Sequence, residues 1–332
     1  MKARRGVAMI AALWLVVAIA VVALQFSLDA KERRALGMNA AERAQERAAA
    51  TGALAFTQAR IEKALRDAQT LNRGNVNAMR TSDPLLDVDS LYSGQSMVDS
   101  VLVYIHARDL GALININSAG MTEVTWRQFF NFVLKDDNKA DQLAQAIMDW
   151  RDQDNLARIK GGEHDEYVRA NAVALPANAD FRDPSELLLV MGMTPEIYAQ
   201  VGQYFTTHGT GIINLNNAPV PVLWSLPGMN DALVSQILSL RSGGQRITSV
   251  AQVVGATAGP RRPGTPAQQA LFTNQANQLT GTLSQRAGVN TLEVDLTITA
   301  RVNPQAEPAR YVATLTRPGA NATTLNISWR QW

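Results

Sequence analysis

The sequence predicts an α+β fold: a long N-terminal helix on a small antiparallel sheet, with a large inserted all-α domain that contains helix–hairpin–helix-like turns. Three observations carry this prediction. Helix-forming residues extend from the N-terminus to about residue 71. Alternating apolar residues indicate strands at 98–107 and again after residue 291. The long stretch between these strands has helical periodicity, so a helical domain interrupts the sheet.

The first element is an uncharged apolar run from Val7 to Leu24. A helix of this length spans about 27 Å, enough for the core of a bilayer. Basic residues precede the run, which places the N-terminus in the cytoplasm and the bulk of the chain in the periplasm. A cleaved secretory signal, cut near Ala18-Ile19-Ala20, is the alternative. Retention as a single-pass inner-membrane anchor is favoured because the helix continues beyond the membrane.

That continuation runs from Asp29 to Leu71 and is rich in Ala, Glu, Arg and Gln, which are strong helix formers. Apolar residues recur in it at helical spacing: Leu54, Ile61, Leu65, Ala68 and Leu71. One helix is therefore expected to run from the membrane to the periplasmic body.

Strands are predicted at both ends of the body. The segment from Thr291 to Val302 alternates almost perfectly, and 311–316 and 324–329 are further candidates joined by the turn signal at 318–321. Between the two groups of strands, residues 126–134 and 143–150 form apolar stripes typical of core helices. A weak internal repeat follows, in which Gly192 and Gly228 each end one helix just before the next begins.

Composition limits the possible functions. The chain has no cysteine, so disulfides, thiolate metal sites and cysteine nucleophiles are excluded. Three of the 31 basic residues precede Gly6, and without them 28 basic residues face 29 acidic ones. A nearly neutral body offers no broad field for phosphates. No nucleophile, zinc-protease or phosphate-loop motif is present, so no enzyme is predicted; an anchored enzyme with an unrecognised site is a minor alternative.

The densest group of oxygen ligands lies in two adjoining segments, 149–155 and 161–167. Crowded carboxylates repel one another, and a hard cation relieves that cost. Ca²⁺ accepts irregular oxygen-rich loops, whereas Mg²⁺ requires a stricter octahedron. The spacing is not that of an EF-hand. A solvated acidic loop and a catalytic carboxylate pair are the competing interpretations.

A second motif is Ile213-Asn214-Leu215-Asn216-Asn217-Ala218-Pro219, which has a shorter echo at 114–119. Its asparagines are expected to cap the following helix. With the turn at Gly228 it resembles a helix–hairpin–helix module, and this sets up the competing function: a membrane-anchored periplasmic module for DNA binding and uptake. Four nearby arginines would serve it: Arg241, Arg246, Arg261 and Arg262. The hairpin lacks its usual second glycine, so nucleic acid is not the expected partner.

A basic leader ending in Gly6, followed by an apolar helix that becomes amphipathic, resembles the type IV pilin and pseudopilin family. The resemblance implies that a prepilin peptidase cuts between Gly6 and Val7. The fifth residue after this cut is Ala11, where the family usually has Glu. The whole order of motifs resembles the large minor pseudopilins of type II secretion systems: the acidic segments, then the Asn-rich motif and the Leu-Pro-Gly-Met turn.

This second resemblance implies a subunit at the tip of a pseudopilus that initiates assembly and supports export of folded proteins. It implies GspI and GspJ as partners, with GspH and the secreted proteins as further candidates. It also implies a structural Ca²⁺ site in the insert. The implied ligands are Asp152, Asp154, Glu163 and Asp165, with Asp149 and Asn155 as helpers. The expected divisions are 1–6 (leader), 7–28 (transmembrane helix), 29–117 (pilin-like helix and first strands), 118–285 (inserted α-domain) and 286–332 (C-terminal strands).

Overall fold

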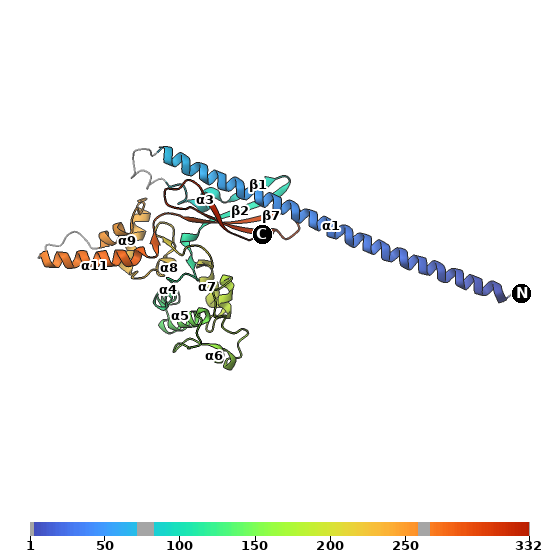
Figure 1. The fold of residues 1–332 in the computed structure, drawn as a ribbon, viewed down its shortest axis with the longest axis horizontal. Helices are drawn as coiled ribbons and strands as arrows, with labels where there is room; N and C mark the ends of the chain where they lie inside the picture. The colour runs from blue at the N-terminus through green and yellow to red at the C-terminus, as the bar shows by residue number, and fades with distance from the viewer. Residues whose placement is uncertain (1–2, 72–82, 258–265, 332) are drawn as a thin grey trace.

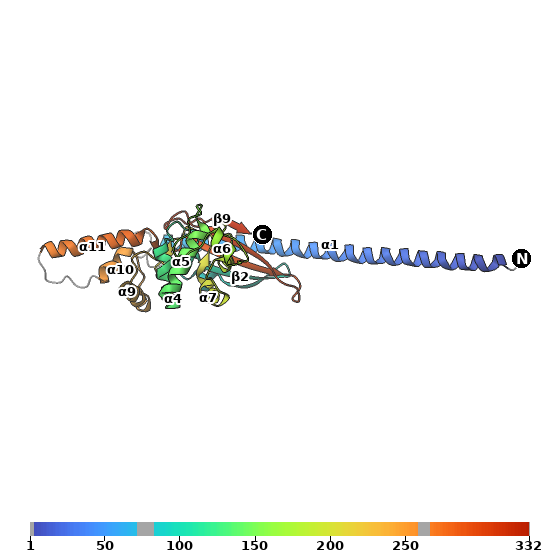
Figure 2. The ribbon, with the colours of Figure 1, turned by 90° about the horizontal axis from the view of Figure 1, so that it is seen from below.

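The computed structural model describes residues 3–71, 83–257 and 266–331. A 69-residue helix, α1 (Ala3–Leu71), projects far beyond the body, and only its C-terminal part lies on the sheet (Figure 1). Within the described residues, α1 is the one helix long and apolar enough to cross a membrane, and its apolar span is not buried. Figure 2 shows that the N-terminal end of α1 and the outer end of α11 lie at opposite extremes of the molecule.

The pilin-like body is a five-stranded antiparallel sheet in the order β1-β2-β7-β8-β9. Its strands are β1 (Gly94–Val98), β2 (Val101–Asp109), β7 (Glu293–Arg301), β8 (Ala309–Thr316) and β9 (Asn326–Gln331), and the short helix α3 (Val88–Tyr92) precedes them. The predicted strand at 98–107 corresponds to β2; only Val98 belongs to β1, because the chain turns at Asp99 and Ser100, both with positive φ. The sheet packs its alternating apolar face against α1, where Leu54, Ile61 and Leu65 are buried as their spacing predicts.

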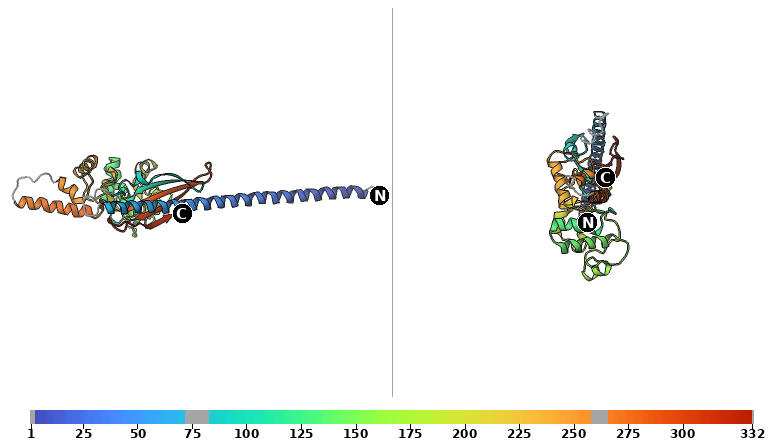
Figure 3. Two further views of the ribbon diagram at one scale, coloured as in Figure 1. Left: turned by 90° about the horizontal axis from the view of Figure 1, so that it is seen from above. Right: turned by 90° about the vertical axis from the view of Figure 1, so that its left-hand side faces the viewer.

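Between β2 and β7 the chain forms the helical insert, whose longer helices are α4 (Glu123–Leu134), α5 (Asp137–Arg151), α9 (Asp231–Ser242) and α11 (Pro266–Ser284). Its short helices are η1 (Leu110–Ala112), α6 (His164–Arg169), η2 (Pro184–Leu189), α7 (Pro195–Val201), η3 (Gly202–Tyr204), α8 (Val220–Leu223) and α10 (Val250–Thr257). The helices α4, α5 and α6 lie on the side of the sheet away from α1 (Figure 3). The sequence did not predict α11, which lacks a strong apolar stripe.

Two short parallel strand pairs add to the helices of the insert. They join β3 (Ile114–Asn115) to β4 (Phe205–Thr206) and β5 (Ile213–Asn214) to β6 (Ala287–Gly288). All four strands lie in the insert's own hydrophobic core, which is centred on the aromatic group of Trp126, Phe129 and Phe130. The two Asn-containing motifs therefore open equivalent halves of the insert. The helix-ending glycines of the weak repeat have φ of +87° at Gly192 and +76° at Gly228, as a left-handed C-terminal residue requires.

Candidate metal site

The loop between α5 and α6 carries the acidic residues. Helix α5 ends at Arg151, and the next residue, Asp152, is extended with φ −73° and ψ 168°. Helix α6 begins at His164, directly after Glu163. The loop from Asp152 to Glu163 therefore starts and ends on carboxylates that two helix termini hold in place.

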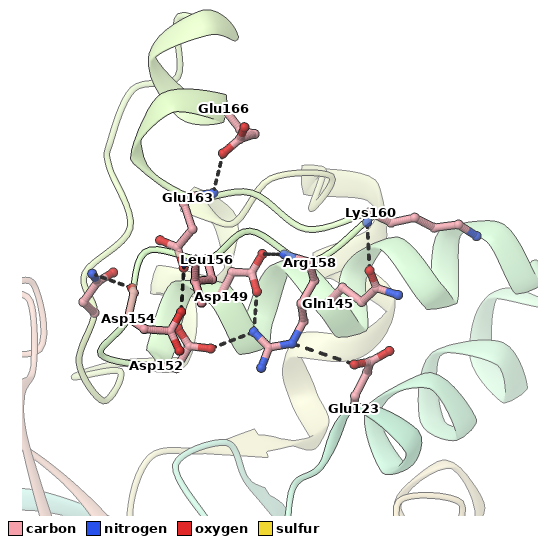
Figure 4. A network of polar contacts seen from close by, with 11 residues as sticks. Glu123, Gln145, Asp149, Asp152, Asp154, Leu156, Arg158, Lys160, Glu163 and Glu166 are labelled. Atoms are coloured by element: carbon pink, nitrogen blue, oxygen red, sulfur yellow. Dashed lines mark hydrogen bonds and ion pairs between the residues drawn. The ribbon is translucent and has the colours of Figure 1, made fainter.

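Three of the predicted ligands converge across this loop. Asp152, Asp154 and Glu163 each place a carboxylate oxygen within 4.8 Å of the others (Figure 4). Glu163 is only 3% exposed, Asp152 is half-buried and Asp154 is exposed. Among the described residues, neither carboxylate oxygen of Glu163 has a hydrogen-bond partner, and Oδ1 of Asp152 has none either. Buried oxygens without donors are costly, so this cluster has vacant acceptor capacity aimed at one point.

Arg158 contacts the carboxylate cluster through Asp152, and the sequence pattern did not single out this arginine. Its guanidinium pairs with the fully buried Asp149 and donates to Oδ2 of Asp152 at 2.6 Å; its Nε lies 3.8 Å from Glu123. Burial lowers the pKa of Arg158, but the hydrogen bonds that Arg158 donates to Asp152 and Asp149 raise this pKa by more than burial lowers it. Arg158 therefore stays charged. Arg158 and Lys160 both stand between the two acidic segments, so the sequence alone offered no signal that distinguished Arg158.

Gly161 permits the close approach of the loop to α5. A Cβ at this position would lie 2.1 Å from Oδ2 of Asp149, a distance that no side chain could tolerate. The backbone amide of Arg158 also donates to Oδ2 of Asp149 at 3.0 Å, and the amide of Lys160 donates to Gln145 at 2.8 Å. The loop is thus fastened to α5 by protein contacts that leave both carboxylate oxygens of Glu163 and Oδ1 of Asp152 free.

The other proposed ligands lie elsewhere. The side chain of Asp165 is 86% exposed and pairs with His164 at 3.2 Å, outside the converging group. The side chain of Asn155 accepts a hydrogen bond from Asn178 at 3.2 Å. Asp149 faces Arg158 and supports the loop. Gly6 and Val7, the expected processing site, lie in the first turns of α1, where the structure describes the backbone.

This arrangement fits a hard divalent cation. The converging groups offer only carboxylate oxygens, and four acids (Asp149, Asp152, Asp154 and Glu163) face one guanidinium, which leaves an excess of negative charge. Three carboxylates spread over an irregular loop suit Ca²⁺, which takes six to eight oxygens; water and backbone carbonyls would supply the remainder. His164 points to Asp165, so no imidazole joins the cluster.

The electrostatics agree with this interpretation. Burial raises the pKa of Glu163 to about 7, and the charges of Asp149, Asp152 and Asp154 add to the rise. A buried carboxyl surrounded by acids must either take up a proton or gain a cation. Near neutral pH a divalent ion would therefore compete directly with a proton at Glu163.

The asparagine motif has a structural role that differs from the predicted helix caps. Oδ1 of Asn214 accepts a hydrogen bond from the backbone amide of Asn216. The side chain of Asn216 accepts a hydrogen bond from the amide of Ile247 and donates to the carbonyls of Ile247 and Val289. The cap prediction for these residues was wrong: no side chain caps α8. Asparagine can satisfy a backbone N–H and C=O together, and that bridging capacity is used here.

The arginines near the hairpin are engaged within the insert and at its edge. Arg241 donates to the carbonyls of Leu215 and Ala218 at 2.7 Å each, and Arg246 donates to the carbonyl of Asp83 at 3.1 Å. Arginines that bond internal carbonyls are not available to phosphates. Arg261 and Arg262 lie outside the described residues. This geometry gives the DNA-binding alternative no support.

Three comparisons relate this geometry to known proteins. The family model described as type II secretion system (T2SS), protein K, matches residues 112–208, which contain the whole carboxylate loop. Type II secretion system protein K of Dickeya chrysanthemi is 32% identical over 79 residues, which make up 24% of this chain and 21% of that protein. The aligned stretch thus spans about a fifth of the curated relative's length.

A chain in the crystal structure of the GspK-GspI-GspJ complex from the type 2 secretion system of enterotoxigenic Escherichia coli has a similar fold. The match has a TM-score of 0.50 and 15% identity, and covers 87% of this chain and 98% of that one. At this identity the likeness concerns the fold.

The fold and the site together define a pilin-like protein whose sheet is interrupted by a helical, carboxylate-bearing insert. Residues 112–208, which lie within that insert, match the protein K family of type II secretion systems, and the fold as a whole is similar to that of a chain in the GspK-GspI-GspJ complex.

Proposed function

We propose that this chain is the minor pseudopilin at the tip of a type II secretion pseudopilus, anchored in the inner membrane by α1, where it initiates assembly and supports export of folded proteins. The observation that carries the proposal is the protein K domain itself, placed as a bulky insert on a pilin-like sheet. Pilin-like subunits are expected to pack through their N-terminal helices. The insert stands off the sheet and away from α1, where a subunit stacked above in a shaft would need space (Figure 1).

The sequence of α1 favours an end position as well. The pilin resemblance implies that Glu at the fifth mature position pairs with the N-terminal ammonium of a neighbouring subunit. A carboxylate inside an apolar helix bundle is costly without such a partner. This chain has Ala11 there, so it has no need of a subunit already in place. A first subunit is the one position in a filament where that neighbour does not exist.

The partners proposed for this chain are its own GspI- and GspJ-type subunits, with GspH as a further candidate. The solved complex to which the fold is similar contains GspK, GspI and GspJ, and that composition is the support for the proposal. A prepilin peptidase would process the chain between Gly6 and Val7, leaving α1 in the membrane. Mass analysis of the N-terminus of membrane-extracted protein tests this step; a mature start beyond Ala20 would restore the ordinary signal peptide.

The carboxylate loop is proposed as a structural Ca²⁺ site of the insert. Asp152, Asp154 and Glu163 would hold the ion, with Asp149 and Arg158 fixing the loop behind them. Bound Ca²⁺ would join the end of α5 to the start of α6 and remove the cost of the vacant acceptors. The proposed role is rigidity of the insert.

The tip position is tested by imaging. The chain has no cysteine, so Asn138→Cys gives one labelling site on the exposed face of α5. Labelled protein is co-expressed with the other pseudopilins and the filaments are examined by electron microscopy with gold label. One label at one filament end is expected. Labels spread along the shaft would refute the assignment, and failure to co-purify with GspI- and GspJ-type subunits would refute the proposed partners.

A further inference from the structure

The described residues form two hydrophobic cores that share no member. One core lies between α1 and the sheet and contains Ile61, Val103 and Ile298. The other fills the insert around Trp126 and Phe129. Apolar burial therefore stabilises each unit separately. What fixes one unit against the other must come from other contacts.

Several of those contacts lie where the chain crosses between the units; elsewhere, Arg246 of the insert donates to the carbonyl of Asp83 at 3.1 Å and Arg108 of β2 donates to that of Gln203 at 2.8 Å. The chain leaves the sheet at Asp109, the last residue of β2, and returns through Thr291 just before β7. Asp109 is 2% exposed. Its Oδ2 accepts from Thr291 Oγ1 at 2.9 Å, so the outgoing and returning segments are tied to each other by one carboxylate.

The same carboxylate also reaches into the insert. Oδ2 of Asp109 accepts from Nδ2 of Asn214 and of Asn217, both at 2.8 Å, and Oδ1 accepts from the amide of Gly111 at 2.8 Å. Asn214 and Asn217 belong to the motif that opens the second half of the insert. Two connecting segments and this distant motif thus meet on one side chain.

The buried carboxylate of Asp109 requires all of these hydrogen-bond donors. Burial raises the pKa of Asp109, and the bonds from Asn217, Asn214, Thr291 and Gly111 lower it. All four donors are neutral. A buried carboxylate that neutral donors satisfy depends on keeping them all, because each lost bond leaves a charged oxygen unsatisfied. Displacing the insert would break several of these bonds together.

Nearby contacts between the units are polar as well. Oε2 of Glu293 accepts from the amide and the hydroxyl of Thr210 at 2.6 and 2.9 Å. His208 lies 3.4 Å from Asp295. Polar contacts are directional, so they select one orientation while adding modest free energy. Polar contacts of this kind fix the orientation of the insert relative to the sheet, and they can break without unfolding either core.

We propose that Asp109 is a latch that holds the helical insert in one orientation on the pilin-like sheet, and that weakening its hydrogen bonds lets the insert swing as a folded unit. The residues that form the latch are separate from the carboxylate loop.

Pulsed electron–electron resonance on the full chain in detergent micelles tests this latch. Because the chain has no cysteine, spin labels are placed at Asn138→Cys on α5 and Arg310→Cys on β8, both exposed. A second pair, Asn138→Cys with Ser235→Cys, lies within the insert and reports its integrity. The unsubstituted latch should give one narrow distance distribution for each pair.

Asp109→Asn keeps the shape of the side chain but replaces one acceptor with a donor, which faces the donors of Asn214 and Asn217 at the Oδ2 position or the amide of Gly111 at the Oδ1 position. We expect the distribution between the units to lose its single narrow peak, while the pair within the insert stays narrow. The matched control, Asp231→Asn, makes the same change at an exposed position in α9 and should leave both distributions narrow. An unchanged distribution between the units in Asp109→Asn would overturn the proposal.

If Asp109→Asn also broadens the pair within the insert, the milder Thr291→Val decides. It removes one donor to Asp109 and keeps the side-chain shape. Broadening between the units alone supports the latch. A narrow distribution between the units in Thr291→Val, or broadening within the insert again, would show that the bonds serve stability and not orientation.

Discussion

At the scale of single residues, Glu163 dominates the behaviour of the carboxylate loop. It is nearly fully buried, and both its oxygens lack a donor among the described residues. Asp154 is exposed and Asp152 shares its other oxygen with Arg158, so both can be solvated or paired without an ion. The free energy that a cation supplies is therefore concentrated at Glu163.

Glu163→Gln is expected to abolish most of the stabilisation of the insert by Ca²⁺, because one charged ligand is lost. At about 100 times its Kd, a ligand adds about 2.7 kcal/mol of stability. The metal-free variant should be at least as stable as the metal-free parent, since the neutral amide removes repulsion from Asp149, Asp152 and Asp154. Thermal melting with Ca²⁺ or chelator measures both effects.

The matched control is Asp165→Asn. This carboxylate is 86% exposed and outside the converging group, so the Ca²⁺-dependent shift in Tm should persist. Loss of the shift in Asp165→Asn but not in Glu163→Gln would mean that the ligand set is different from the one proposed.

The pH dependence follows from the same residue. Its pKa rises from 4.5 to about 7 on folding, mainly through burial. Between these values the folded chain holds a proton that the unfolded chain has lost, so the stability of the metal-free protein should fall as pH rises through this window. Ca²⁺ requires the ionised form, so its stabilising effect should grow across the same window. Melting curves with and without Ca²⁺ at about pH 5 and about pH 8 should show that the Tm of the metal-free protein falls with pH while the increase in Tm caused by Ca²⁺ grows. If both quantities changed in the same direction, the assignment would be contradicted.

At the scale of elements, two asparagine bridges define the halves of the insert. The side chain of Asn117 accepts a hydrogen bond from the amide of Phe181 and donates to the carbonyls of Phe181 and Thr207. Asn216 makes the equivalent hydrogen bonds to Ile247 and Val289. Each bridge follows a two-residue parallel strand pair, which is too short to be stable by itself. The side-chain amides therefore supply hydrogen bonds beyond those that such short strands can make.

Asn216→Ala should destabilise the insert by about 2–4 kcal/mol, because three backbone groups lose a partner at about 1 kcal/mol or more each. Amide hydrogen exchange of Ile247, whose N–H donates to Asn216 at 2.9 Å, should accelerate. Asn274→Ala in α11 is the control: it changes an exposed helical residue and should stay within about 0.5 kcal/mol of the parent. Slow exchange at Ile247 in Asn216→Ala would show that the bridge is dispensable.

At the scale of the whole molecule, the described residues form two hydrophobic cores that share no member, so we expect the chain to behave as two folding units. We expect differential scanning calorimetry to resolve two transitions, because no shared apolar core forces the units to melt together. Ca²⁺ should raise only the transition of the insert, since Asp152, Asp154 and Glu163 lie in that unit. Glu163→Gln identifies the transition by removing its Ca²⁺ response. A single transition that Ca²⁺ shifts as a whole would show that the units are strongly coupled.

The sequence by itself determined the α+β class, the long N-terminal helix, the split sheet and the acidic loop as the candidate site. These features depend on local periodicity and composition, which a window of residues contains. It did not determine α11, whose apolar residues lack a regular spacing, or the true role of the asparagines in the second motif.

Only the tertiary structure decided which acids converge. Asp165 and Glu163 are two residues apart, yet Glu163 is buried in the cluster and Asp165 points into solvent, because the start of α6 turns them to different faces. Arg158 and Asp109 gained their roles in the same way. The side-chain partners of Asp109 lie up to 182 residues away in sequence, and spacing along the chain cannot encode contacts that exist only after the two crossings of the chain are brought together.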